Sequence, residues 1–293
     1  MLNDRNFDCA YGLAEQVSPR IRRVVARNPG PFTFLGTGTY IIGRGRVAVI
    51  DPGPDLAGHV EALLSALAGE TVSHILITHT HIDHSPASAA LKAATGAPCL
   101  GFGPHGFRGD TGEAGADLAF HPDIRMADGE EVSGDDWTLT AIHTPGHASN
   151  HLCFALAEEK ALFSGDQVMG WSTTVVSPPD GDMAAYMASL DRLLARRDRI
   201  YWPTHGGPIR DPQAHVAELI AHRRARRAAI LASLTAGPAR PAEIVAKVYL
   251  GLDPRLVEAA AESVRAHLIE LAAAGLVAEQ GGVWRRIQAG SGM

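Results

Sequence analysis

Cysteine is scarce in this sequence. The three cysteines, Cys9, Cys99 and Cys153, have no paired spacing, so a disulfide framework is not expected. Long apolar runs are missing as well: no stretch of about 18 apolar residues occurs, which argues against a membrane-spanning helix. The first residues lack the apolar stretch and the small-residue cleavage site of a signal peptide. The sequence therefore predicts a protein of the cytoplasm that crosses no membrane.

A strong excess of positive charge is also lacking. The formal net charge of −6 argues against binding of nucleic acid by the molecule as a whole. The charge is unevenly divided, however. Residues 1–222 carry 16 Lys and Arg against 26 Asp and Glu, whereas residues 223–293 carry 10 against 6. A local basic patch in the C-terminal part therefore stays possible.

Short β-rich runs alternate with Gly and Pro up to about residue 205. Strands are predicted at residues 22–26, 33–42, 46–51, 74–78, 137–143, 152–157, 161–164 and 200–203. Helices are predicted at 56–67, 86–94 and 183–195. This mixture predicts an α/β fold with a sheet core and helices outside. Residues 101–123 have no periodicity, so they are expected to form a long surface loop that is either near a functional site or merely mobile.

The C-terminal part has a different pattern. Three helices are predicted at residues 214–234, 241–249 and 254–274, and a hairpin at 276–287 turns at Gly281-Gly282. Three helices followed by a hairpin is the order of a winged helix. We therefore predict two domains, a catalytic domain at 1–212 and a helical extension with a winged-helix domain at 213–293.

One segment dominates the chemistry of the sequence. Four candidate ligands stand in the run His79-Thr80-His81-Ile82-Asp83-His84, directly after a predicted strand. Imidazole and carboxylate ligands without thiolate suit zinc, manganese or iron. Further candidates follow other predicted strands: His147, Asp166 and His205. A single His or Asp at a strand end is usually a cap or a surface residue, and only the set together predicts a metal site.

This set closely resembles the metallo-β-lactamase superfamily, whose fold is a four-layer αββα sandwich with the metals at one edge. The resemblance covers about residues 20–210. It implies that His79, His81 and His147 hold a first metal ion, that Asp83, His84 and His205 hold a second, and that Asp166 bridges both. The expected cofactors are two Zn²⁺ per chain, with manganese or iron as alternatives.

A finer resemblance concerns one branch of the superfamily. Thr144-Pro145-Gly146-His147, Phe163-Ser164-Gly165-Asp166 and the winged helix are similar to the lactamase-beta-2-like group, whose members are described as endoribonucleases. The resemblance implies cleavage of single-stranded RNA by a metal-bridging hydroxide, with Asp83 as a candidate proton acceptor. Thr204 is a departure, because the group commonly has glycine before the ligand that matches His205.

Other functions remain open. The main alternative is hydrolysis of a small-molecule ester, thioester or lactone, as in glyoxalase II. A β-lactam hydrolase is less favoured, since export and a single compact domain would be expected. An alternative of another class is a metal-binding regulator that places its winged helix on DNA. The winged helix is equally compatible with mere packing or with a homo-oligomer.

Three residues are candidates either to hold the metal ligands from behind or to line the pocket. Asp51 matches a position that the family places behind the ligands, although a carboxylate in a strand-end turn is an equal alternative. His151 is either such a residue or an ordinary core or surface histidine. Trp171 either lines the cleft or packs in the core. No role is predicted for His74, His105 or His121.

The most basic stretch begins at His222. On a helix Arg223 and Arg227 share a face, as do Arg224 and Arg227. Phosphate contact by Arg223, Arg224, Arg226 and Arg227 is one hypothesis. The other is a solvated face that pairs with the acidic body of the chain.

Overall fold

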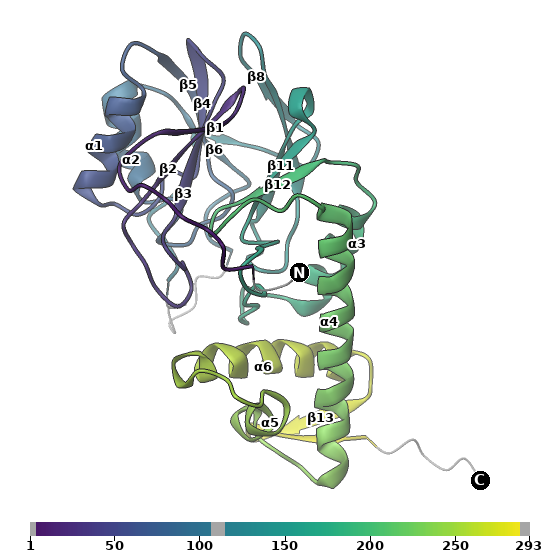
Figure 1. Ribbon diagram of the computed structural model, residues 1–293. Helices are drawn as coiled ribbons and strands as arrows, with labels where there is room; N and C mark the ends of the chain where they lie inside the picture. Colours follow the sequence, from purple (N-terminus) through teal and green to yellow (C-terminus); the bar gives the residue numbers. More distant parts are fainter. Residues whose placement is uncertain (1–3, 107–114, 288–293) are drawn as a thin grey trace.

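Two mixed sheets pack face to face in the computed structural model, which describes residues 4–106 and 115–287 (Figure 1). The first sheet consists of β1 (Glu15–Ser18), β2 (Ile21–Val25), β3 (Gly38–Ile42), β4 (Arg46–Ile50), β5 (Thr71–Leu76), β6 (Cys99–Gly101) and β7 (Ile124–Arg125), in that order. The second consists of β8 (Glu131–Ser133), β9 (Thr138–His143), β10 (Leu152–Leu156), β11 (Ala161–Gly165) and β12 (Ile200–Pro203). Its strand order is β12-β11-β10-β9-β8.

Helices cover the outer face of each sheet. Helices α1 (Ala57–Ala66) and α2 (Ala87–Thr95) pack on the first sheet through Leu63 and Leu91. Helices α3 (Met183–Leu194) and α4 (Pro212–Ser233) pack on the second through Tyr186 and Leu219. The largest core lies between the sheets and includes Tyr40, Phe154 and Phe163. The predicted four-layer αββα sandwich is thereby confirmed. No helix in the described ranges combines the length and the hydropathy needed to cross a bilayer.

The strand directions gather the predicted site residues at one edge. Strands β4 and β5 are parallel, and so are β11 and β12. The carboxyl ends of parallel neighbours lie at the same edge of a sheet, which is where ligand sites form. Asp51 follows β4, the segment 79–84 follows β5, Asp166 follows β11 and His205 lies beyond β12. The topology therefore brings together residues that are far apart in the chain.

The first sheet differs from the prediction in two ways. The strand predicted at 33–42 is wrong for its first half, since β3 begins at Gly38 and residues 32–35 form a turn. Phe34 has a positive φ of 55°, and the chain at Gly36 approaches the carbonyl of Ala26. The short strands β1, β6 and β7 of this sheet were not predicted, and neither was β8 of the second sheet, because two to four residues carry little periodicity.

Part of the loop predicted at 101–123 lies outside the described residues, namely 107–114. The described part lies against the segment 79–84. The backbone N–H of Ile82 donates to Gly115 O at 2.8 Å, and the N–H of Asp117 donates to Thr80 O at 2.8 Å. The hydroxyl of Ser85 donates to the Asp117 carboxylate at 2.6 Å. This loop therefore borders the candidate metal ligands.

The C-terminal helices and hairpin form a winged helix, as predicted. After α4 come η2 (Leu234–Ala236), α5 (Pro241–Val248), η3 (Pro254–Leu256), α6 (Val257–Ala273) and the hairpin of β13 (Val277–Gln280) and β14 (Val283–Arg286). A further short helix, η1 (Ala157–Glu159), lies between β10 and β11. Figure 1 shows α4 running from the sandwich into the winged helix. The predicted boundary at 212/213 falls at the start of this shared helix, because Leu219 belongs to the catalytic core and Ile230 to the winged-helix core.

We expect Gly36→Ala to destabilise the fold more than Gly45→Ala does. Both glycines have positive φ, 143° and 70°. A Cβ on Gly36 would lie 2.0 Å from Ala26 O, whereas a Cβ on Gly45 would meet no atom within 4 Å. Gly45→Ala should therefore cost about 1 kcal/mol of the free energy of unfolding, and Gly36→Ala about 2 kcal/mol more. Urea unfolding of both variants measures the difference, and equal losses would contradict the close approach.

Candidate metal centre

The seven predicted ligands lie together at the edge of the sandwich. Their ligand atoms form three groups in which all members lie within 4.8 Å of one another. The groups are His79, His81 and His147; Asp83, His84 and His205; and His79, His84 and Asp166. The first two groups match the division between two metals that the sequence analysis expects, and Asp166 lies between them.

In the first group three ring nitrogens face one another. Nδ1 of His81 lies 3.0 Å from Nε2 of His79 and 3.1 Å from Nε2 of His147. The other ring nitrogen of His147 donates to Val175 O at 2.7 Å. Nδ1 of His79 donates to Thr78 Oγ1 at 3.0 Å, because that hydroxyl gives its own proton to Asp51. In both rings Nδ1 is therefore the nitrogen that bonds the surrounding protein, and Nε2 is the nitrogen that faces His81.

Three converging lone pairs fit a shared cation. With zinc–nitrogen distances of about 2.0–2.1 Å, two nitrogens of a tetrahedral site lie about 3.3 Å apart. Burial, followed by the neighbouring His147, lowers the pKa of His81 to about 3. Burial also lowers the pKa of His79 well below its usual value. Neutral imidazoles are the form in which histidine binds metals.

The second group combines two imidazoles with a carboxylate. Nε2 of His205 lies 3.1 Å from Asp83 Oδ2, and Nε2 of His84 lies 3.6 Å from the same oxygen. Although burial opposes the charged form, Asp166 and Asp83 raise the pKa of His205 to about 10. Burial likewise favours the neutral form of Asp83, but His84 and His205 hold the pKa of that carboxyl below its usual range. Both carboxylates of the site are therefore ionised at neutral pH.

Asp166 contacts both groups. Its Oδ2 lies 3.6 Å from His84 Nε2 and 3.8 Å from His147 Nε2, and its Oδ1 lies 3.5 Å from His205 Nε2. Nε2 of His84, Nε2 of His205 and Oδ1 of Asp166 are buried, and the contacts printed for them are with other members of the two groups. Buried groups that contact one another and are all able to ligate fit a binuclear cation site.

Asp51 holds the second group from behind. Its Oδ1 accepts from the N–H of Thr78 at 2.8 Å, and its Oδ2 accepts from the Thr78 hydroxyl at 2.7 Å. Oδ2 also accepts from His84 Nδ1 at 2.9 Å. A carboxylate in this position fixes the ring and leaves Nε2 free as a ligand. Asp51 therefore supports the site from its strand-end turn, so the two roles considered for it coincide.

Thr204 adds a fourth donor to Asp51. Its hydroxyl lies 3.2 Å from Asp51 Oδ2, and its residue is 4% exposed. The positive φ of this turn, 86°, is at Gly206 rather than at residue 204. A threonine before His205 therefore causes no strain, and the departure from the family pattern supplies a hydrogen bond that glycine lacks.

His151 and Trp171 lie next to ligand-bearing segments without belonging to the three groups. His151 is fully buried, and its Nε2 accepts from the N–H of Asp166 at 3.2 Å. Trp171 stacks on Phe34 at a centroid distance of 5.0 Å and packs against Gly206, the neighbour of His205. The Trp171 side chain is buried, which agrees better with packing in the core than with a place in the wall of an open pocket.

The four arginines of the basic stretch have different surroundings. Arg223 is 2% exposed and donates to Thr174 O. Arg226 donates to Val248 O and lies over the ring of Tyr249 at 4.0 Å. Arg227 forms an ion pair with Glu270 at 2.8 Å. Arg224, with a side chain 67% exposed, lies 3.9 Å from Asp191. A phosphate on the first three would have to displace contacts within the chain. Arg223 also does not belong to a solvated face, because it is buried.

Sequence reasoning missed several residues around the ligands. His105 is buried, and its Nδ1 lies 3.1 Å from Thr80 Oγ1. Asn150 donates to the same hydroxyl at 2.9 Å. The hydroxyl of Thr174 donates to Asp166 O at 2.7 Å. No spacing in the sequence distinguishes His105, Asn150 or Thr174 as residues of the site. The one signal was that Asn150 is close to the candidate ligand His147 in the chain.

The geometry agrees with comparisons to known families. Residues 33–205 match the model of the Metallo-beta-lactamase superfamily, and residues 241–284 match the Beta-lactamase associated winged helix domain. The chain therefore belongs to the metallo-beta-lactamase superfamily. The resemblance inferred from the sequence is confirmed, and the assignment supports a hydrolase of the metallo-beta-lactamase type.

Curated relatives are similar over about three quarters of this chain. The chain is 36% identical over 229 residues to a lactamase-like protein of Aspergillus niger, covering 77% of this chain and 67% of that one. It is also 36% identical over 224 residues to an atrochrysone carboxyl ACP thioesterase of Claviceps purpurea, covering 75% and 67%. The alignments thus span about two thirds of these relatives.

Solved structures share the whole fold. A metallo-beta-lactamase family protein from Thermus thermophilus superposes with a TM-score of 0.77 at 26% identity, covering 93% of this chain and 100% of that one. A beta-lactamase domain protein from Burkholderia ambifaria gives a TM-score of 0.81 at 22% identity, covering 97% and 96%. The high coverage includes the winged helix.

Asp51→Asn should weaken metal binding without removing a ligand. An amide keeps the size of the carboxylate but presents an NH₂ group, or a weaker acceptor, to donors of Thr78 and His84. Loss of such a partner typically weakens metal affinity about 10–100-fold. Competition with a chelator measures the affinity, and Asp55→Asn, at an exposed carboxylate nearby, serves as the control. Equal affinities in the two variants would show that Asp51 does not orient His84.

Proposed function

We propose that this chain is a binuclear metal-dependent hydrolase of acyl thioesters. The observation that carries the proposal is the 36% identity to an ACP thioesterase over 75% of the chain. A second thioesterase of the same name, from Aspergillus fumigatus, is also 36% identical, over 227 residues. These relatives support the ester and thioester alternative of the sequence analysis over RNA cleavage, which was its leading expectation.

The proposed ligands follow the two groups of the structure. His79, His81 and His147 would hold one cation, Asp83, His84 and His205 would hold the other, and Asp166 is placed to serve both. Divalent cations held there would supply water activation at neutral pH and polarisation of the carbonyl group. Zinc suits this donor set, as do manganese and iron.

Asp83 is proposed as the proton acceptor. Its side chain is 22% exposed, whereas those of His84 and His205 are 0% and 1% exposed. The carboxylate is therefore both ionised and reachable from the surface. A thiol has a pKa near 8.5, so a thiolate leaves without protonation. Hydrolysis of a thioester consequently needs a group that takes a proton from water, but no strong acid for the leaving group.

Two other functions are less well supported. Cleavage of RNA would use the basic stretch for phosphate contacts, and three of its four arginines already bind groups within the chain. A regulator that places its winged helix on DNA would not need converging lone pairs at the edge of the sandwich. The arrangement of the ligands therefore favours turnover.

Substrate class is tested with four probes at once. We expect the zinc- or manganese-loaded protein to hydrolyse a model acyl thioester faster than the matching oxygen ester, a lactone or labelled single-stranded RNA, because the thiolate is the best leaving group of the esters. A chelator should abolish the activity, and added metal should restore it. Chelator-sensitive cleavage of RNA at a higher kcat/KM than that for the thioester would reverse the proposal.

Asp83→Ala tests the proton acceptor and second-site ligand together. We expect kcat/KM for the thioester to fall about a thousandfold, which corresponds to about 4 kcal/mol of transition-state stabilisation. Asp135→Ala removes an exposed carboxylate between β8 and β9 and should leave kcat/KM unchanged. Steady-state kinetics with metal analysis of both proteins give the comparison. Turnover of Asp83→Ala within tenfold of the unaltered protein would exclude Asp83 from both roles.

A further inference from the structure

The segment of residues 174–178 lies between the metal ligands and the winged helix. It follows β11 in the chain and precedes α3. On its inner side Val175 O accepts the proton of His147 Nδ1 at 2.7 Å, and Thr174 Oγ1 donates to Asp166 O at 2.7 Å. The orientation of one imidazole and the backbone position of the bridging carboxylate therefore depend on this segment.

Helix α4 holds the segment through a buried cation. Arg223 donates to Thr174 O, and its guanidinium lies 5.1 Å from the ring centroid of Tyr186. The hydroxyl of Tyr186 donates to Gln167 O at 3.1 Å, one residue beyond Asp166. A buried cation is costly unless it is well placed. Here the cation bonds the backbone of the segment 174–178 and lies over the ring of a tyrosine whose hydroxyl bonds the residue after Asp166.

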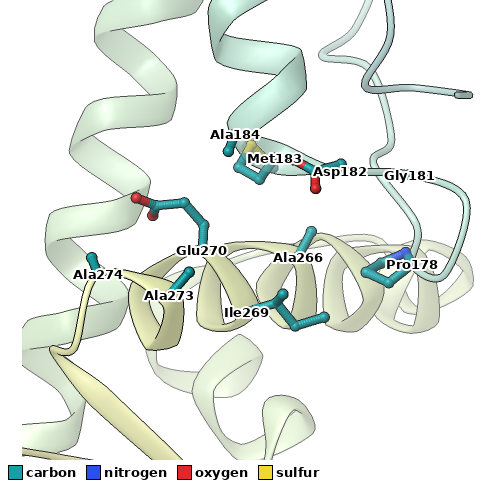
Figure 2. Close-up of a pocket in the computed structure, with 10 residues that line it drawn as sticks. All are labelled: Pro178, Gly181, Asp182, Met183, Ala184, Ala266, Ile269, Glu270, Ala273 and Ala274. Carbon is teal, nitrogen blue, oxygen red and sulfur yellow. The ribbon is translucent and has the colours of Figure 1, made fainter.

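Helix α6 holds the segment from the other end. The N–H of Val176 donates to Ser263 Oγ at 3.5 Å, and Arg265 donates to Pro178 O. Arg265 is itself held by Glu262 at 2.8 Å. Figure 2 shows Pro178 above α6, with Met183 facing Ala266 across a cavity of about 280 Å³. The contact between the catalytic domain and the winged helix therefore includes a cavity. It is held by the polar contacts of Ser263 and Arg265 in addition to apolar contacts.

We propose that the winged helix serves the metal centre, with Arg223, Ser263 and Arg265 as positioning residues that act through the segment 174–178 on His147 and Asp166. The inference rests on the metal ligands of the proposed function and gives the winged helix a role within the same chain. Without Arg223, Thr174 O loses its donor, the segment gains freedom, and the ring of His147 is no longer fixed toward His81. The first metal site is then less preorganised.

Metal affinity is the readout that separates this role from a structural one. Arg223→Gln and Ser263→Ala are compared with Val277→Ala, which removes volume from the winged-helix core away from the segment. Cobalt(II) titration followed by absorption, with chelator competition, gives the affinity of each site in the full-length chain, and thermal unfolding gives its stability. We expect Arg223→Gln to weaken cobalt binding at one site about tenfold, the lower end of the range for partners of ligands. Ser263→Ala should weaken it less.

Val277→Ala should lower the melting temperature and leave the cobalt affinity unchanged. Equal affinities for Arg223→Gln, Ser263→Ala and the unaltered chain overturn the proposal, as does an equal loss in Val277→Ala. Should Arg223→Gln fail to fold, Ser263→Ala and Arg265→Gln decide the outcome by the same comparison. Fewer than two cobalt equivalents in the unaltered chain would instead defeat the proposed function, so the two failures are distinguishable.

Discussion

The structure depends on one electrostatic constraint: nitrogen lone pairs and ionised carboxylates are held against one another at the edge of the sandwich. In the first group two imidazole nitrogens, of His79 and His147, lie 3.0 and 3.1 Å from His81 Nδ1. Such an arrangement is unfavourable by itself and becomes favourable when cations occupy it. The surrounding fold must therefore prevent the ligands from relaxing apart, and much of the architecture serves that purpose.

Rigidity of the site comes from the strand ends and from Asp51. This residue has a positive φ of 47°, a conformation that costs a non-glycine residue about 1 kcal/mol. In return its carboxylate accepts from Thr78 of the loop after β5, from His84 and from Thr204 beyond β12. One side chain thus ties together three segments that the two sheets bring to the same edge. On the other side, Val175 O and His151 fix His147 and Asp166.

The winged helix is continuous with this arrangement rather than an appendage. Helix α4 contributes to two cores, and Arg223 connects it to the segment beside the metal ligands. A domain that holds a loop of a metal site does not need an exposed basic face, which agrees with the internal contacts of Arg226 and Arg227. The proposed thioester chemistry is compatible with a site whose carboxylate at Asp83 is partly exposed.

By itself the sequence predicted the candidate ligands, the four-layer sandwich and the winged helix. The candidate ligands and the winged helix are readable locally, from the run His79–His84 and from the order of the C-terminal elements, whereas the sandwich followed from the resemblance to the superfamily. Only the tertiary structure decided how Thr204 meets Asp51, where β3 begins, and whether Arg223 faces solvent. Each depends on contacts between residues far apart in the chain, such as Gly36 against Ala26. Neither composition nor spacing specifies such contacts, because close packing selects them only when all layers are assembled.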